Sequence, residues 1–243
     1  AWPPLLLWSV ERATRSPYWQ AWLPVAAIYG LQGLAGHPQV SLLSALLAGA
    51  YSLMGPLAAP SDLSLRKQTW QGARCVAALA LGAALAMAQW GPSLELTRLS
   101  ERGHGLESDF FTSFSLHPLQ WVTMLWPFVR GNPYPLTSLE TIGYVGVLPL
   151  ILALLALWRR PSRLVFFWTA VGAVALLLTL GRWNPAYRWL ARVPLMNMFR
   201  APARYLLWLD LAVAVLAATT FDSLLGLTRT ARRRALVAPG AGL

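Results

Sequence analysis

Two arginines close to the start of an apolar run have a spacing that suits phosphate binding. Arg200 and Arg204 lie in the segment Phe-Arg-Ala-Pro-Ala-Arg-Tyr, and Pro202 between them suits the first turn of a helix. A helix start offers unpaired backbone N–H groups and the positive end of the helix dipole, to which two guanidinium groups add charge. Placement of both side chains at the lipid interface, without any ligand, is the alternative explanation.

Acidic and basic side chains are divided between two long polar segments. The segment 182–204 carries five arginines and no acid. The segment 93–140 carries three basic residues and five acids, namely Glu95, Glu101, Glu107, Asp109 and Glu140. If the two segments lie on one face of the protein, a cleft between them would suit an anionic ligand whose other end is neutral and hydroxylated.

Two smaller groups of polar residues are further candidates for a substrate cleft. Glu95, Arg98 and Arg102 are spaced by three and four residues, so they share one face if the segment is helical. They form either a solvated salt-bridge ladder or, together with Glu101, part of the cleft wall. The second group lies in the turn Gly-His-Pro-Gln at 36–39. Gly and Pro by themselves explain why the chain turns here. Its other two residues, His37 and Gln39, either cap a helical hairpin or contact a ligand.

One carboxyl group stands inside an apolar run. Asp210 follows Arg204 by six residues, about 9 Å along a helix. An acid at such depth in a membrane usually faces a cavity or a polar partner, so a structural role and a functional role are both open. No metal site is predicted, because Cys75 is the only cysteine and the three histidines show no metal-binding spacing. The sequence also lacks nucleotide-binding loops and a serine-hydrolase elbow.

The composition predicts an all-α integral membrane protein. The chain is 56% hydrophobic and 12% charged, whereas soluble domains have about 25% charged residues. Each of its nearly uncharged runs is long enough to cross a bilayer. Residues 1–243 are therefore expected to form a single polytopic membrane domain with about six transmembrane helices, two extracytoplasmic loops and no separate soluble domain. The runs are 18–36, 39–58, 75–92, 141–158, 164–181 and 205–221.

Basic residues predict the orientation of these spans. The short links 11–15, 66–74, 159–163 and 229–234 hold twelve Lys and Arg, against eight on the opposite face, so the links are assigned to the cytoplasm. The net charge of +11 is thereby explained by topology, without a nucleic-acid partner. Tryptophans near run ends, such as Trp19 and Trp22, suit an aromatic belt at the lipid interface.

The segment 110–129 is the exception on which the orientation depends. It is uncharged and 20 residues long, so it could cross the membrane and invert all later spans. The inverted arrangement would place eleven basic residues inside and nine outside, so the charge bias decides little. Pro118 and Pro127 favour a broken re-entrant or interfacial segment instead.

Four stretches of the sequence together resemble the YfhO family of bacterial membrane proteins, which is related to the GT-C glycosyltransferases. Their order and spacing span nearly the whole chain. The resemblance implies a multi-pass protein of the bacterial cytoplasmic membrane and transfer of a sugar from a polyprenyl-phosphate donor to a cell-envelope glycan or lipid acceptor, outside the cytoplasm. The stretches are 31–39, 89–96 continuing to 100–102, 143–150 and 199–204.

The resemblance also implies where the catalytic base should be. Related enzymes place their catalytic carboxylate in the first long extracytoplasmic loop, near the start of the chain. The sequence begins with Ala-Trp-Pro-Pro, so it is expected to be a fragment that lacks this N-terminal loop. The catalytic residue is therefore unknown, and a divalent metal requirement is left open. A transporter or flippase for a lipid-linked anion, or a non-catalytic membrane subunit, remains the alternative function.

Overall fold

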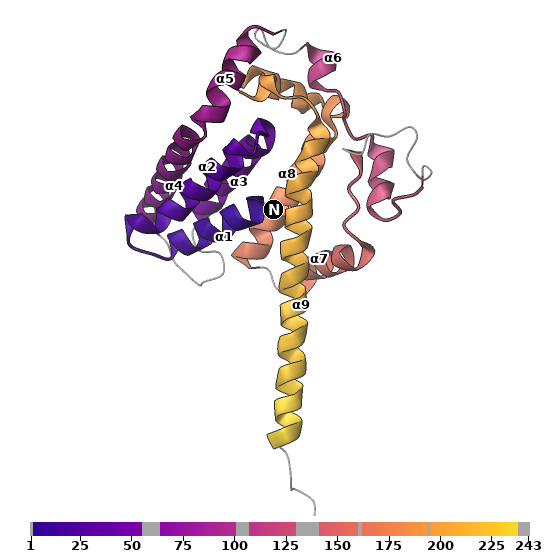
Figure 1. Cartoon of the computed structure of the whole chain (residues 1–243). Helices are drawn as coiled ribbons and strands as arrows, with labels where there is room; N and C mark the ends of the chain where they lie inside the picture. Colours follow the sequence, from indigo (N-terminus) through magenta and orange to yellow (C-terminus); the bar gives the residue numbers. More distant parts are fainter. Residues whose placement is uncertain are drawn as a thin grey trace, which may run out of the picture. The chain divides into compact units, whose positions relative to one another are not determined.

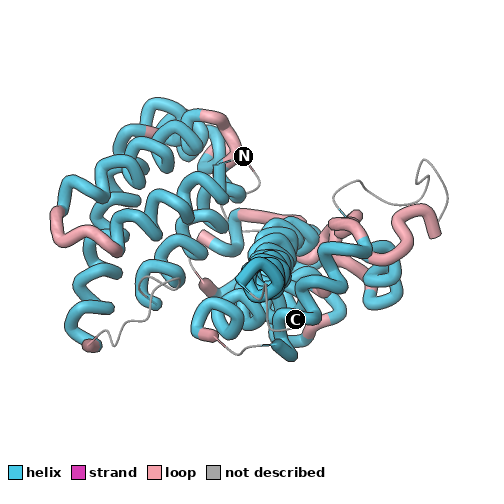
Figure 2. The backbone as a smooth tube through the Cα atoms, turned by 90° about the horizontal axis from the view of Figure 1, so that it is seen from below, coloured by secondary structure: helices cyan, strands magenta, loops and turns pink. Residues whose placement is uncertain are grey.

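The described residues fold into helices and contain no strand (Figures 1 and 2). The structure is a computed structural model that describes residues 2–54, 64–100, 107–129, 141–159, 162–193 and 195–237. It divides into two compact units, Ala1–Ser113 with Ala186–Ala201 and Phe114–Pro185 with Pro202–Leu243. The predicted all-α class is confirmed for this part of the chain.

The first unit is a group of helices around a core that includes Leu6, Val10, Val25 and Leu43, each at most 2% exposed. Its elements are α1 (Trp2–Thr14), η1 (Trp19–Trp22), α2 (Leu23–Leu34), α3 (Pro38–Met54), α4 (Leu65–Leu85), α5 (Met87–Arg98), α6 (Ser108–Phe111), η6 (Pro185–Arg192, from Ala186 onward) and η7 (Met196–Met198).

The turn between α2 and α3 follows from its sequence. Gly36 has a φ of +81°, the left-handed conformation that commonly ends a helix and that glycine adopts without steric cost. Pro38 is the first residue of α3, where its missing N–H is not needed. The His37 carbonyl then accepts the Ser41 N–H at 3.1 Å. The two helices are thus joined by a very short turn, as predicted.

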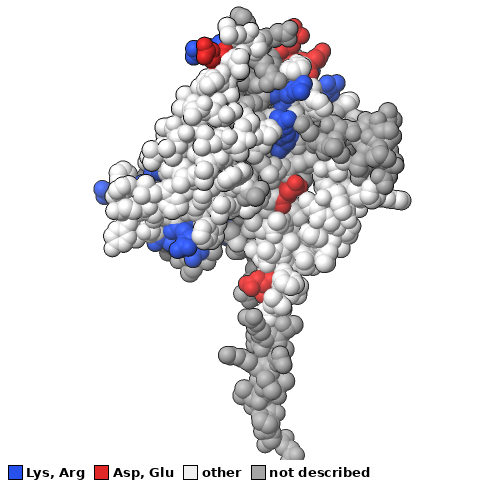
Figure 3. Space-filling view, viewed as in Figure 1, with Lys and Arg blue, Asp and Glu red and all other residues white. Residues whose placement is uncertain are grey.

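Helices α2 and α4 pack closely because small residues line their contact. A Cβ added to Gly82 would lie 2.6 Å from the Ala26 carbonyl oxygen, and one added to Gly33 would clash with the Ala86 Cβ. Small residues that let helix backbones approach are typical of helix contacts within membranes. The uncharged surface of this unit lies over α2 and α4, between charged side chains at its two ends (Figure 3).

The structure changes the bounds of the predicted run 75–92. Helix α4 begins ten residues earlier, at Leu65, and the chain bends by 76° between α4 and α5. The fully buried Ala86 stands at the bend, where its Cβ meets the Gly33 position. Beyond the bend, the Trp90 ring packs edge-on against Tyr29, with ring centroids 6.0 Å apart. These contacts favour a bend over a straight continuation.

The second unit is built around a long helix. Its elements are η3 (Pro118–Met124), α7 (Val147–Arg159), α8 (Arg163–Thr179), η5 (Gly181–Trp183), η8 (Pro202–Tyr205) and α9 (Leu206–Val237). A Cβ on Gly172 of α8 would lie 3.4 Å from the Ala212 Cβ of α9. The Thr220 hydroxyl of α9 donates a 2.8 Å hydrogen bond to the Leu152 carbonyl of α7. Helices α7 and α8 therefore both pack against α9.

One helix of the described residues is long and apolar enough to cross a membrane by itself. It runs over Pro202–Gly226, and the bent pair of α4 and α5 passes the same test only when both helices are counted together. The helices Pro38–Met54, Val147–Trp158 and Arg163–Thr179 are apolar but shorter. Six separate spans therefore stay a prediction.

The segment 110–129 does not form one continuous helix. Helix α6 ends at Phe111, Phe114 has a positive φ of 58°, and Pro118 starts the separate element η3. The His117 side chain caps η3 by accepting the Leu119 N–H at 3.2 Å. The predicted break in this segment is confirmed, and its re-entrant or interfacial location stays a prediction.

Candidate functional site

A hydrogen bond in the first unit joins two of the predicted site residues. Gln39, in the first turn of α3, is 7% exposed, and its side-chain Nε2 donates a 2.8 Å hydrogen bond to the main-chain oxygen of Arg200. The next residue, Ala201, is fully buried and has a φ of 70°, a conformation that costs most side chains energy. Gln39 thus helps to hold a tight backbone turn beside Arg200.

The ring of Phe110 lies against this arginine, and the next residue in the sequence stacks on a further ring. The Arg200 guanidinium carbon lies 4.9 Å from the centroid of the Phe110 ring, within the range of a cation–π interaction. The neighbouring Phe111 stacks on Tyr187 with ring centroids 5.2 Å apart, and both rings are buried. An arginine held against a ring loses rotational freedom and keeps the in-plane N–H donors that bind carboxylate or phosphate oxygens.

These contacts bring the acidic and the basic segments together within the first unit. Asp109, next to Phe110, is exposed, as is Glu107 two residues earlier. Arg188 and Arg192 are exposed on η6, which also carries Tyr187. Carboxylates and guanidinium groups therefore occur on two segments that pack through Phe110 and Phe111, as the charge distribution of the sequence predicts.

The second unit shows a further contact between the same two loops. The Leu116 N–H donates a 2.8 Å hydrogen bond to the Thr179 carbonyl, and the Arg182 N–H donates one of 2.9 Å to the Ser115 hydroxyl. His117 packs edge-on against Trp183, with ring centroids 4.6 Å apart. Parts of both loops are therefore adjacent here too, and their location on one face of a membrane stays a prediction.

Arg204 is placed as its sequence predicts, in the turn that begins at Pro202 and leads into α9. It is half-buried and belongs to the second unit, whereas Arg200 belongs to the first. The structure therefore describes the two guanidinium groups separately, and a phosphate site that uses both stays a prediction.

The remaining cleft candidates lie on exposed positions or outside the described residues. His37 is exposed in the turn before α3. Glu95 and Arg98 are exposed on α5, which confirms that their segment is helical up to Arg98. Glu101 and Arg102 lie outside the described residues, so their predicted place on the cleft wall is untested.

The intramembrane candidate Asp210 lies in α9, one residue after Leu209, which packs toward Gly172 of α8. Its Oδ1 atom is buried and has no hydrogen-bond partner within the part of the chain that the structure describes. A buried oxygen without a partner is costly, so it is usually retained for a reason other than stability. Among the described residues, no group of three His, Cys, Asp or Glu side chains is arranged to hold a metal ion.

Sequence reasoning missed the aromatic part of the site. Phe110 and Tyr187 were not candidates, because the chain has 13 Trp, 8 Phe and 7 Tyr, and aromatic residues in such a sequence suit the lipid interface. The available signal was the position of Phe110 directly after Asp109, at the charged end of an uncharged segment. Comparison of the chain with protein-family models, curated proteins and solved structures gives no match. Within the described residues, fold and site thus define an all-α protein with one helix that could cross a membrane by itself and a polar cluster that contains Arg200.

Proposed function

We propose that the chain is part of a YfhO-type, GT-C-like glycosyltransferase of the bacterial cytoplasmic membrane. In this proposal, about six transmembrane helices position loops outside the cytoplasm, where a sugar passes from a polyprenyl-phosphate donor to a cell-envelope acceptor. The observation that supports it best is the hydrogen bond from Gln39 to Arg200. This bond joins the stretches 31–39 and 199–204, two of the four on which the resemblance rests.

The proposed chemistry gives each charged group a role. The phosphate of the departing lipid carrier needs positive charge, which Arg200 and Arg204 would supply. Activation of the acceptor hydroxyl needs a carboxylate base, which the resemblance places in the first long extracytoplasmic loop. His37, Gln39, Glu95, Arg98, Glu101 and Arg102 would line the cleft for sugar or acceptor.

Sugar transfer by the full-length protein tests this proposal. The protein is reconstituted in membranes with radiolabelled polyprenyl-phosphate sugars, and labelled envelope acceptor is measured. Arg200→Ala combined with Arg204→Ala should abolish transfer, while Arg66→Ala combined with Lys67→Ala, two exposed basic residues on α4, should retain it. Gel filtration in detergent shows whether each variant is folded. Full activity of the folded double variant would contradict the phosphate-binding role.

Transport of a lipid-linked anion is a second candidate function, because α9 carries Asp210, whose buried Oδ1 has no hydrogen-bond partner among the described residues. Buried acids in membrane helices often mark the path of an ion or substrate. A flippase assay in proteoliposomes separates the two functions. Movement of a fluorescent polyprenyl-phosphate sugar between leaflets, without transfer to any acceptor, would favour transport.

A further inference from the structure

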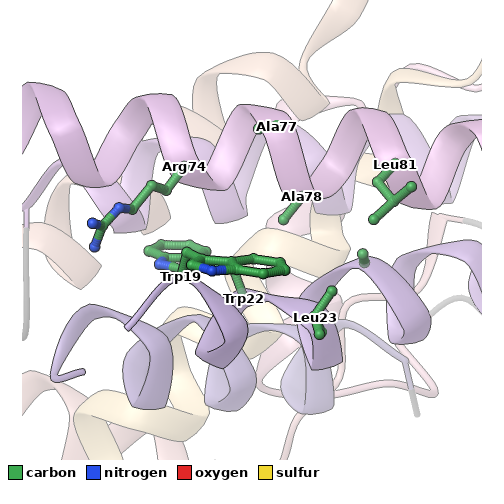
Figure 4. A pocket seen from close by; sticks show the side chains of 8 residues that line it. Trp19, Trp22, Leu23, Arg74, Ala77, Ala78 and Leu81 are labelled. Carbon is green, nitrogen blue, oxygen red and sulfur yellow. The ribbon is translucent and has the colours of Figure 1, made fainter. Parts of the chain in front are cut away.

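The first unit contains a groove whose lining suits a lipid. Its residues are distant in sequence from Arg200. Its cavity volume is about 230 Å³, and it lies between α4 and the segment formed by η1 and the start of α2 (Figure 4). On α4 it is lined by Ala77, Ala78 and Leu81, and on the opposite wall by the indole rings of Trp19 and Trp22. These walls are apolar, so the groove suits a hydrocarbon chain.

The groove has one polar end. Arg74 lies at that end and Leu81 at the other, seven residues or about 10 Å further along α4, with the two indoles between them (Figure 4). The Arg74 side chain is half-buried, and its Nη1 donates a 3.3 Å hydrogen bond to the Pro17 carbonyl. Its guanidinium carbon lies 5.6 Å from the Trp70 ring centroid. The side chain is thus held in place at the groove entrance.

A second polar group lies within the groove wall. Trp22 is 4% exposed, and its indole Nε1 has no hydrogen-bond partner among the described residues. This N–H group is enclosed by protein atoms and does not reach the groove surface, so Arg74 is the group that can meet a polar part of a ligand.

The surroundings of the polar end are positively charged. The Gln71 side chain donates a 2.8 Å hydrogen bond to the Thr14 carbonyl, which ties the end of α1 to the start of α4. Arg12 on α1 and Arg15, one residue after the end of α1, are exposed close to this tie. Glu11, an acid of α1, already accepts hydrogen bonds from Arg15 and from the Tyr51 hydroxyl. An anionic headgroup is therefore favoured over a zwitterionic one.

We propose that this groove binds an anionic membrane phospholipid, with its headgroup phosphate against Arg74 and one acyl chain along Ala77, Ala78 and Leu81. Small-molecule pockets usually have about 300–1,000 Å³, so this smaller groove would hold the upper part of one chain and leave the rest in the bilayer. The inference rests on the membrane location within the proposed function, and it does not depend on glycosyl transfer.

Native mass spectrometry of the full chain, purified in mild detergent, tests the site. The protein is titrated with phosphatidylglycerol and, separately, with phosphatidylcholine of the same acyl chains. Phosphatidylglycerol should bind more tightly, and Arg74→Gln should weaken its binding about tenfold, as expected for loss of a charge-assisted hydrogen bond. Arg66→Gln, an exposed change on the same helix, should alter binding by less than about twofold.

A second pair of variants tests the apolar part. Ala77 lines the groove and is exposed, so Ala77→Phe should fill it and reduce lipid binding without disturbing the core. Ala80→Phe, an exposed change on α4 outside the groove, is the matched control. Equal affinity for the two lipids, or equal effects of Arg74→Gln and Arg66→Gln or of the two Phe variants, would overturn the proposal. Displacement of the lipid by inorganic phosphate would also overturn it, by showing a site for phosphate alone.

The outcomes also separate this inference from the proposed function. If sugar transfer is detected but the protein binds phosphatidylglycerol and phosphatidylcholine equally well, only the groove proposal fails. If the preference is measured without any transfer, the glycosyltransferase proposal fails and the lipid site stands.

Discussion

Gln39 donates a side-chain hydrogen bond of 2.8 Å to the main-chain oxygen of Arg200, 161 residues away in the sequence. We predict that Gln39→Ala lowers the free energy of unfolding by about 0.5–1.5 kcal/mol, because a part-buried hydrogen bond is lost. The control is His37→Ala, an exposed change two residues earlier, with an expected effect within about 0.5 kcal/mol. Thermal unfolding in detergent measures both. Equal melting temperatures for the two variants would contradict a stabilising role for this bond.

The close packing of α2 and α4 gives a second prediction. Gly82→Ala should destabilise the protein by about 1–3 kcal/mol, because the added Cβ would lie 2.6 Å from the Ala26 carbonyl oxygen. Gly49→Ala in α3 is the matched control, since a Cβ there meets no atom within 4 Å. Higher helix propensity should make the control slightly more stable. Chemical unfolding curves measure the free energy of unfolding of both variants. If Gly82→Ala leaves it unchanged, α2 and α4 must lie further apart than in the structure.

The helices were largely predictable because they follow from run length and from proline and glycine at their ends. The predicted run 39–58 corresponds to α3 (Pro38–Met54), and 164–181 corresponds to α8 (Arg163–Thr179). The bend at Ala86 was not predictable, because the apolar run continues through it without a break. It depends on contacts with Gly33, which is distant in sequence and gives no local signal.

The site was predictable only in part. Its polar residue types pointed to Gln39 and Arg200 separately, but no spacing rule connects residues so far apart. Phe110 gave no signal of its own among the many aromatic residues of the chain. The separation of acidic and basic residues between the two loops did help to predict the site. Opposite charges on two loops can be seen in the composition of the sequence, whereas a contact with one aromatic ring cannot.

The contact between Arg200 and Phe110 predicts a graded effect on activity. Phe110→Leu keeps an apolar side chain but removes the ring, so we expect sugar transfer to fall about 2- to 30-fold, as for loss of a cation–π interaction of about 0.5–2 kcal/mol. Phe128→Leu, an exposed aromatic change in the other unit, is the control. Steady-state transfer assays measure both. An unchanged rate in Phe110→Leu would mean that the ring does not position Arg200 for the reaction.

The half-buried Asp210, one of whose oxygens is buried, predicts opposite effects on stability and function. Asp210→Asn should raise the free energy of unfolding by about 1 kcal/mol, because an amide costs less to bury than a carboxylate whose Oδ1 has no hydrogen-bond partner among the described residues. Asp222→Asn, an exposed change on the same helix, should be neutral. If the carboxyl serves transport, lipid movement should stop in Asp210→Asn despite its greater stability. Destabilisation by this change would instead show that the carboxyl has a favourable structural partner.

The predicted orientation can be tested with single cysteines, because Cys75 is buried and is the only cysteine in the chain. In a Cys75→Ala background, His37→Cys should react with a membrane-impermeant maleimide added outside intact cells, and Arg66→Cys should react only after lysis. Both positions are exposed in the structure. Ser113→Cys and Val129→Cys, on either side of η3, should both react from outside if 110–129 is re-entrant or interfacial. Labelling of only one of them from outside would show that this segment crosses the membrane, and all later loops would then change sides.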